Sequence, residues 1–372
     1  MAYTRFNHDV YKFAGDLVSG AIGVGKLVLL AVCRRDHCVL VYQTRVLFYG
    51  NTVPDLYDLR VFRTALVVAS LSPAAGVIYP NAAALALVPG LQGGARPLKL
   101  QPLVGGSVNA SWDVVSSQGR FVLRMDGVPE RTLGVDRARE HAAQGAAAAA
   151  GHAARIVAVD LNIGARVCEY LPGRVWTADD FTDLTAVVRL GACLARVHAL
   201  PVPDELRLFD PVAHAREYAR RVDPMIAAAH DLAATMTELQ NAAARVTAAA
   251  LASGVPARII HGDLAHGNVV EDAGTDGSPV KEANANKTGV RLLDWEYAQL
   301  APPLYDIGCI LAYYPQAGRH TAQLLAASGF GDGVASRYAQ ALPAATYVYQ
   351  VLTWLWLLAR GQGGSAPCVT PG

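Results

Sequence analysis

Two short segments of the 372-residue chain carry carboxylate and amide side chains in an order suited to phosphoryl transfer. The run from His261 to Asn268 reads His-Gly-Asp-Leu-Ala-His-Gly-Asn, and residues 292–297 read Leu-Leu-Asp-Trp-Glu-Tyr. Phosphoryl transfer needs a carboxylate that orients and deprotonates the attacking hydroxyl, and oxygen ligands that hold Mg²⁺ against the nucleotide phosphates. We therefore predict that Asp263 is the base and that Asn268 and Asp294 are the Mg²⁺ ligands.

Short apolar segments flank these residues and must position them. Residues 258–260 lead into the first run, residues 268–270 leave it, and residues 290–293 lead to the aspartate of the second run. Strands at these places would bring the three polar side chains to one edge. Residues 271–289 are rich in Gly, Asp, Asn and Lys, which predicts an exposed hairpin loop. A single Asp or Asn in a turn usually reflects turn chemistry, but three in this order favour catalysis.

Together these motifs resemble those of the choline kinase, thiamine kinase and aminoglycoside phosphotransferase superfamily. The resemblance includes Tyr-Asp-Ile-Gly at residues 305–308 and extends over about residues 81–360. It implies an α+β, protein-kinase-like fold with two lobes. A small N-lobe (81–172) would hold an antiparallel sheet and a helix, and a larger C-lobe (173–362) would be mostly helical, followed by a disordered tail (363–372). It also implies ATP and Mg²⁺ as cofactors and a small-molecule substrate.

The resemblance also assigns a nucleotide-binding side. Strand-like segments surround Gly105, Gly106 and Ser107, and glycines there let backbone N–H groups approach phosphates. Arg124 takes the place of the cation on the third strand, where its planar fork can contact phosphate oxygens. Glu140 takes the place of its helical partner. The backbone near Glu169 and Leu171 would contact adenine in the hinge between the lobes.

Residues that support the catalytic loop or bind the acceptor follow from the same resemblance. His261 and Asp306 are expected to brace the loop by hydrogen bonds, and His198 is expected to be structural. The acceptor side would include Glu296 and an aromatic surface for a quaternary ammonium, for which the candidates are Tyr297, Trp354 and Trp356. The two tryptophans also fit a core helix. Tyr313 stands where choline kinases carry an acidic residue, which counts against choline itself.

Composition narrows the class of protein. The formal net charge is +1 and only 17% of residues are charged, so no basic surface for nucleic acid is expected. Six cysteines form no Cys-x-x-Cys pair, which predicts free thiols. No secretory signal is evident, so we expect a cytoplasmic protein. Residues 64–88 lack charge, but prolines interrupt them, and a membrane span is disfavoured.

Residues 1–80 lie outside the resemblance. Leu27–Cys33 and Cys38–Tyr42 read as two strands around a charged turn. The segment from Gly20 to Leu27 nearly matches a phosphate-binding P-loop, but Leu27 replaces the Ser or Thr that reaches Mg²⁺, so we interpret it as a chance match. This region is either an additional subdomain or a start-site artefact, and the sequence leaves both open.

The favoured function is an ATP- and Mg²⁺-dependent kinase of a hydroxyl on a small cationic metabolite, similar to choline, ethanolamine or thiamine kinases. An aminoglycoside or sugar phosphotransferase is the alternative enzyme. An inactive nucleotide-binding or scaffold protein is the alternative of another class, and the presence of Asp263, Asn268 and Asp294 argues against it. The sequence fixes neither the acceptor nor the oligomeric state.

Overall fold

The computed structural model describes residues 27–34, 37–44, 69–71, 79–103, 109–127, 135–272, 289–361 and 367. The chain divides into two compact units, residues 1–79 and 80–372. The first unit contains a three-stranded antiparallel sheet of order β1-β2-β3, made of β1 (Leu27–Arg34), β2 (His37–Thr44) and β3 (Ala69–Leu71). Its first two strands are those expected from the sequence. The glycine-rich segment 20–26, residues 64–68 and 72–78 of the uncharged run 64–88, and the tail 363–372 apart from residue 367 lie outside the described residues.

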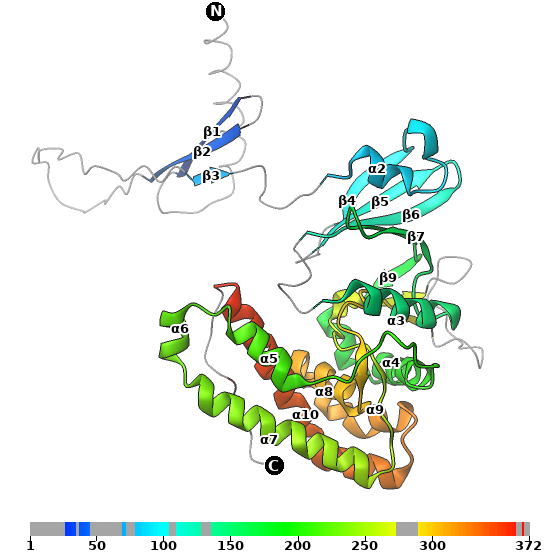
Figure 1. The fold of residues 1–372 in the computed structure, drawn as a ribbon, viewed down its shortest axis with the longest axis vertical. Helices are drawn as coiled ribbons and strands as arrows, with labels where there is room; N and C mark the ends of the chain where they lie inside the picture. Colours follow the sequence, from blue (N-terminus) through cyan, green and yellow to red (C-terminus); the bar gives the residue numbers. More distant parts are fainter. Residues whose placement is uncertain are drawn as a thin grey trace, which may run out of the picture. The chain divides into compact units, whose positions relative to one another are not determined.

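The second unit begins with a five-stranded antiparallel sheet of order β4-β5-β6-β8-β7 (Figure 1). Its strands are β4 (Lys99–Leu103), β5 (Ala110–Ser116), β6 (Gly119–Met125), β7 (Ile156–Asp160) and β8 (Ala165–Glu169). The short helices α2 (Ala82–Ala86) and η2 (Gln92–Gly94) precede it, and α3 (Arg137–Ala149) is inserted between β6 and β7. We call these elements the N-lobe. Its core is apolar, with Trp112, Leu123 and Val167 almost fully buried.

The remaining elements, from β9 to α10, form a mostly helical C-lobe (Figure 1). Its longer helices are α4 (Leu184–Val197), α5 (Pro211–Ala219), α7 (Leu232–Ala252), α8 (Leu304–Tyr313) and α10 (Asp332–Ala359). Its short helices are η4 (Ala178–Thr182), α6 (Pro224–Ala229), η5 (His266–Asn268), η6 (Pro315–His320) and α9 (Thr321–Ala327). The α+β fold class predicted from the sequence is confirmed.

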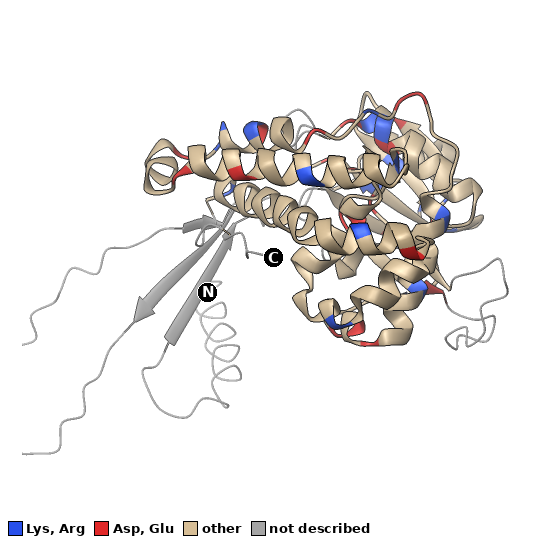
Figure 2. Cartoon of the chain, turned by 90° about the horizontal axis from the view of Figure 1, so that it is seen from below, with Lys and Arg blue, Asp and Glu red and all other residues tan. Residues whose placement is uncertain are grey.

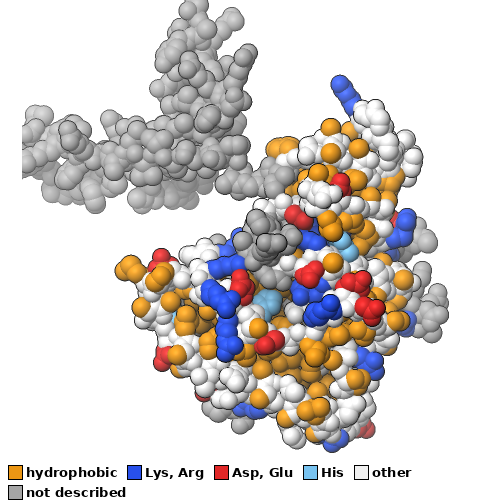
Figure 3. All heavy atoms as spheres, viewed as in Figure 1, with side chains coloured by type: hydrophobic (Ala, Val, Ile, Leu, Met, Phe, Trp, Pro, Cys, Tyr) orange, Lys and Arg blue, Asp and Glu red, His pale blue; other side chains and the backbone are white. Residues whose placement is uncertain are grey.

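Local sequence explains where several of these helices start. Each of α4, α5, α6 and α7 follows an aspartate whose carboxylate accepts a hydrogen bond from a backbone N–H of the first turn, and these caps are Asp183, Asp210, Asp223 and Asp231. Such a cap satisfies a donor that has no partner inside the helix and stabilises it by about 1 kcal/mol. Figure 2 shows that charged residues are sparse along these helices. In Figure 3, positively and negatively charged side chains are interspersed on the face shown.

The C-lobe core is built around the close approach of α8 and α10. A Cβ placed on Gly308 would lie 2.6 Å from the carbonyl carbon of Ala345, so only glycine lets the two helices pack at this distance. Helix α10 is the single helix among the described residues that is long and apolar enough to cross a membrane. However, 67% of its apolar window is buried inside the protein, as in the core helix of a globular domain.

Two small sheets of the C-lobe hold the motifs singled out in the sequence. Strand β10 (Arg258–Ile260) pairs with β13 (Gln299–Ala301), and β11 (Val269–Asp272) lies between β12 (Val290–Leu292) and β9 (Gly173–Val175). The loop from His261 to Asn268 therefore runs between two strands, as the apolar flanks predicted. The pairing of β11 with β12 also agrees with the expected hairpin, whose connection, residues 273–288, lies outside the described residues.

Candidate active site

Asp263, the predicted base, is held by two side chains that donate to its carboxylate. The amide of Asn268 donates to Oδ2 at 2.9 Å and to the backbone oxygen of Asp263 at 3.0 Å, and the Tyr313 hydroxyl donates to Oδ1 at 3.0 Å. Burial raises the pKa of Asp263 above its ordinary value, and the neighbouring charge of Asp294 acts in the same direction. A carboxylate with a raised pKa is a better proton acceptor.

Asp306 ties the start of the catalytic loop to the helical lobe. Its carboxylate accepts hydrogen bonds from the backbone N–H groups of His261 at 3.1 Å and Gly262 at 3.0 Å, and it contacts Nε2 of His198 at 2.9 Å. Nε2 of His261 lies 2.8 Å from the backbone oxygen of Leu293. The loop that carries Asp263 is therefore bound both to α8 and to the segment that carries Asp294.

Gly262 is required by the backbone of this loop. Its φ is +77°, in the left-handed region, and a Cβ would lie 2.7 Å from the backbone oxygen of Tyr297. A larger residue would meet both a conformational cost and a steric clash. This explains the glycine immediately before the predicted base.

Asp294 has the features of a cation ligand. It is the one non-glycine residue with a positive φ (+57°) within the described residues, and such strain gathers at functional sites. Its Oδ1 is buried and has no hydrogen-bond partner, although Nη1 of Arg124 lies 3.6 Å away. Asn268 turns its NH₂ group to Asp263, which leaves its amide oxygen for another partner. One carboxylate and one amide oxygen fit Mg²⁺, which takes few protein ligands beside substrate phosphates.

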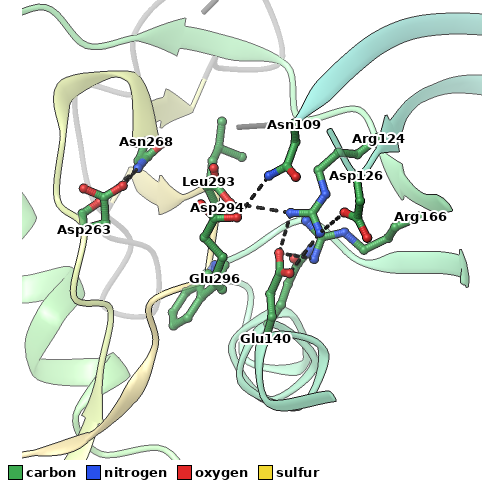
Figure 4. A network of polar contacts seen from close by, with 12 residues as sticks. Asn109, Arg124, Asp126, Glu140, Arg166, Asp263, Asn268, Leu293, Asp294 and Glu296 are labelled. Carbon is green, nitrogen blue, oxygen red and sulfur yellow. Dashed lines mark hydrogen bonds and ion pairs between the residues drawn. The ribbon is translucent and has the colours of Figure 1, made fainter. Parts of the chain in front are cut away.

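Arg124 and Glu140 form the ion pair expected in the N-lobe (Figure 4). Nη1 of Arg124 lies 2.5 Å from Oε1 of Glu140, and Nη2 lies 2.9 Å from Oε2. Burial opposes the charge on Glu140, but the guanidiniums of Arg166 and Arg124 prevail and hold the pKa of Glu140 well below its ordinary value. The pair fixes the Arg124 fork at the edge of the site where phosphate oxygens would lie.

Sequence reasoning missed several members of this network. Nη1 of Arg166 lies 2.6 Å from Oε1 of Glu140. Arg137 contacts Glu140 in the N-lobe and Glu296 in the C-lobe. Asn109 contacts Arg137 and Glu296. Arg137 stands three residues before Glu140, so helical spacing could have placed them together. Asn109 and Glu296 are 187 residues apart, and no local sequence pattern predicts that they are in contact.

A cavity of about 510 Å³ is lined by residues of both the catalytic loop and the N-lobe. The polar residues that line it include Asn109, Arg124, Asp263, Asn268, Asp294 and Glu296. The lining also contains a set of aromatic side chains, namely Phe209, His214, Tyr218, Tyr297, Tyr313, Tyr314, Tyr349 and Trp356. The proposed base, the proposed metal ligands and the N-lobe arginine therefore line one cavity.

The two tryptophans predicted for the acceptor side differ in position. Trp356 lines the cavity, and the guanidinium of Arg360 lies 4.4 Å from its ring centroid. Trp354 does not line the cavity; it is buried and packs edge-on against His230. They are two residues apart on α10, so the 3.6-residue helical period turns them to different sides. The interpretation of Trp354 as a core residue agrees with this position.

The side chains predicted to lie near adenine do not line this cavity. Glu169 is the last residue of β8, and Leu171 lies in the connection from β8 to β9; both are half-buried. Glu169 forms an ion pair with Arg155 at 2.5 Å. Gly105, Gly106 and Ser107 lie outside the described residues, so their assignment stays a prediction.

Solved structures similar to this chain include choline and ethanolamine kinases. A choline/ethanolamine kinase family protein from Mesorhizobium loti has a TM-score of 0.56 and 22% identity over 75% of this chain and 86% of its own. Choline kinase from Cryptosporidium parvum Iowa II has a TM-score of 0.57 and 14% identity, with 74% and 87% covered. Ethanolamine kinase from Plasmodium vivax has a TM-score of 0.55 and 15% identity, with 72% and 77% covered. At these identities the likeness shows the fold, and the predicted protein-kinase-like fold is confirmed.

Comparisons by sequence agree with this result. A search of curated proteins gives no significant match. The model of the phosphotransferase enzyme family matches residues 99–344, about two thirds of the chain. This range includes Arg124, Glu140 and the complete catalytic loop. The chain therefore belongs to the phosphotransferase enzyme family and is a small-molecule kinase.

Proposed function

We propose that this kinase uses ATP and Mg²⁺ to phosphorylate a hydroxyl on a small cationic metabolite of the choline, ethanolamine or thiamine type. The observation that carries the proposal is the single cavity that Asp263, Asn268, Asp294 and Arg124 all line. A base, two oxygen ligands and a phosphate-binding cation are the parts that phosphoryl transfer requires. The neighbouring Glu140 keeps Arg124 charged and oriented.

In this mechanism, Asp263 orients the acceptor hydroxyl and accepts its proton as the bond from the hydroxyl oxygen to the γ-phosphorus of ATP forms. The bond from that phosphorus to the bridging oxygen breaks in the same transfer, and ADP is the leaving group. Asn268 and Asp294 would hold the metal, which supplies charge neutralisation at the phosphates when bound. The guanidinium of Arg124 contacts phosphate oxygens and stabilises the negative charge that spreads over them. Tyr313 keeps the Asp263 carboxylate in one orientation through its hydrogen bond. General-base assistance of this kind contributes about 10²–10⁴-fold to the rate.

A cationic acceptor is supported by the charge and the aromatic content of the cavity. Asp263, Asp294 and Glu296 line it together with a single arginine. Burial and the neighbouring Asp294 raise the pKa of Glu296 to about 7, and a bound cation would stabilise its charged form. Aromatic faces each contribute about 0.5–2 kcal/mol to binding a quaternary ammonium. The likeness to choline and ethanolamine kinases, although at low identity, supports the same class.

An aminoglycoside or sugar acceptor is the alternative, supported by the family alone. An inactive nucleotide-binding protein would not need Asp263, Asn268 and Asp294 at one cavity. We also propose a cytoplasmic location, where ATP is available and the buried thiols of Cys168, Cys193 and Cys309 stay reduced.

The test is a panel of acceptors scored by ADP release from Mg·ATP. Choline, ethanolamine, thiamine, an amino sugar and an aminoglycoside would each be compared with a reaction that lacks acceptor. We expect stimulation by one of the cationic amino alcohols or by thiamine. Stimulation by an aminoglycoside alone would contradict the proposed substrate class, and no stimulation by any of the five would favour the inactive alternative.

A further inference from the structure

We propose that Arg137 is a positioning residue that holds the metal-binding loop of the C-lobe against the phosphate-binding side of the N-lobe. The inference rests on the kinase function proposed above and deepens it. Arg137 itself does not line the cavity, but two of its partners, Asn109 and Glu296, do. It would therefore act on the reaction through these residues.

One guanidinium makes four contacts. Nη1 of Arg137 lies 2.7 Å from Oε2 of Glu140 and 3.2 Å from Oε2 of Glu296. Nη2 lies 3.0 Å from Oδ1 of Asn109 and 3.0 Å from Oδ1 of Asp126. Three of these partners belong to the N-lobe, and Glu296 belongs to the C-lobe. Arg137 thus joins both halves of the site through a single rigid group.

Asn109 completes the link. Its amide donates to Oε2 of Glu296 at 3.0 Å, the same oxygen that Arg137 contacts. Figure 4 shows Asn109 and Glu296 facing each other, with Asp294 and the Arg124–Glu140 pair beside them. The N-lobe therefore holds one carboxylate oxygen of Glu296 with two donors, and Glu296 is only 3% exposed.

The position of Glu296 explains why this link matters. It follows Asp294 by two residues, and Asp294 has a positive φ and a buried oxygen without a hydrogen-bond partner. A residue in that conformation needs the surrounding structure to hold it. Among the described residues, Arg137 is the N-lobe cation that forms an ion pair with Glu296. Its removal would loosen this link and leave Glu296 buried with one donor fewer. Breaking a buried pair by removing one partner is strongly unfavourable.

The chain offers a matched control in Arg166. This residue is also buried and also contacts Glu140, through Nη1 at 2.6 Å. Among the described residues, its hydrogen-bond partners include neither Asn109 nor Glu296. Substituting Arg137 or Arg166 by Gln therefore removes one buried guanidinium from the same carboxylate, but only the first change breaks the link to the C-lobe.

The test is to measure the binding of ADP by calorimetry, with and without Mg²⁺. The full-length wild type, Arg137→Gln and Arg166→Gln would be compared, and thermal unfolding of each would be measured in parallel. We expect Arg137→Gln to weaken binding of ADP with Mg²⁺ at least tenfold and binding of ADP alone less than threefold. Arg166→Gln, which also weakens the support of Arg124 by Glu140, should reduce binding with and without Mg²⁺ by the same factor. Equal losses in the two variants, or an equal loss with and without Mg²⁺ in Arg137→Gln, would overturn the inference.

Arg137→Lys provides a second variant in case Arg137→Gln does not fold. Lysine keeps the charge but lacks the planar fork that reaches several acceptors, so the Mg²⁺-dependent loss should persist. Wild-type affinity in Arg137→Lys would overturn the positioning role. A wild-type chain that binds no ADP with Mg²⁺ would instead contradict the proposed function, and the inference would fall with it.

Discussion

The hydroxyl of Tyr313 lies 3.0 Å from Oδ1 of Asp263 and donates a hydrogen bond to it, from a helix 50 residues further along the chain. The two oxygens of the Asp263 carboxylate are thus held from different directions, because Asn268 donates to Oδ2 at 2.9 Å. This geometry leaves the carboxylate one preferred orientation within the cavity. An acceptor hydroxyl must approach along that direction.

Replacing Tyr313 with Phe should lower kcat by about tenfold, since a hydrogen bond to a charged group contributes about 1.5–3 kcal/mol. The KM for ATP should change little, because the Tyr313 hydroxyl donates to the proposed base, whereas Arg124 is the proposed phosphate-binding residue. Steady-state kinetics with the best acceptor of the panel would measure both constants. An unchanged kcat would show that Asn268 alone orients the base.

Replacing Trp356 with Leu should raise the KM for a cationic acceptor by about 3–30-fold, since one aromatic face contributes about 0.5–2 kcal/mol to cation binding. The matched control is Trp354→Leu, which removes the same side chain from the same helix but outside the cavity. The control should lower the melting temperature and leave the acceptor KM unchanged. A similar rise in KM for both variants would argue against an aromatic wall made by Trp356.

Stability should fall with acidification partly because of His214. Burial and the nearby charge of Arg139 lower the pKa of His214 to about 4, whereas an unfolded histidine titrates near 6.5. The unfolded chain therefore binds a proton first as the pH falls from about 6.5 to 4, and the folded state loses stability over that window. At pH 7 this contribution is fully present.

His214→Gln should therefore reduce the difference in the free energy of unfolding between pH 7 and pH 4.5. We expect a reduction of about 2 kcal/mol, less than the full pKa shift implies, because the ring lines a cavity. Denaturant unfolding at both pH values measures it. His141 has a similarly lowered pKa, of about 4, so some pH dependence should persist. An unchanged pH dependence in the variant would contradict this assignment.

Gly308→Ala should destabilise the C-lobe by about 1–3 kcal/mol, because the added methyl group would overlap the Ala345 backbone between α8 and α10. Gly145→Ala is the matched control. Gly145 lies in α3, and a Cβ there would meet nothing within 4 Å, so helix propensity alone should stabilise it by up to about 1 kcal/mol. Thermal unfolding of both variants tests the opposite signs, and two changes of the same sign would refute this account of the packing.

Much of the fold could be predicted from the sequence because the decisive signals are local. The apolar segments around the catalytic loop predicted β10, β11 and β12. Asp263 and Asn268 lie in the same short loop between β10 and β11, so their proximity could be predicted from the sequence. The partners of Glu140 were only partly foreseen. Arg137 contacts Glu296 across 159 residues, and nothing in the local sequence near either one indicates the other. Such contacts depend on how the lobes pack. The different positions of Trp356 and Trp354, by contrast, follow from the period of the helix that carries both.

The most direct test of the account is a comparison of Asp263→Asn with the wild type. The change removes the proton acceptor but keeps the side-chain size. With Mg·ATP and the best acceptor, kcat should fall by about 10²–10⁴-fold, while calorimetry should show binding of ADP with Mg²⁺ within a few-fold of the wild type. Turnover at the wild-type rate in Asp263→Asn would contradict the central claim that Asp263 receives the proton of the acceptor hydroxyl.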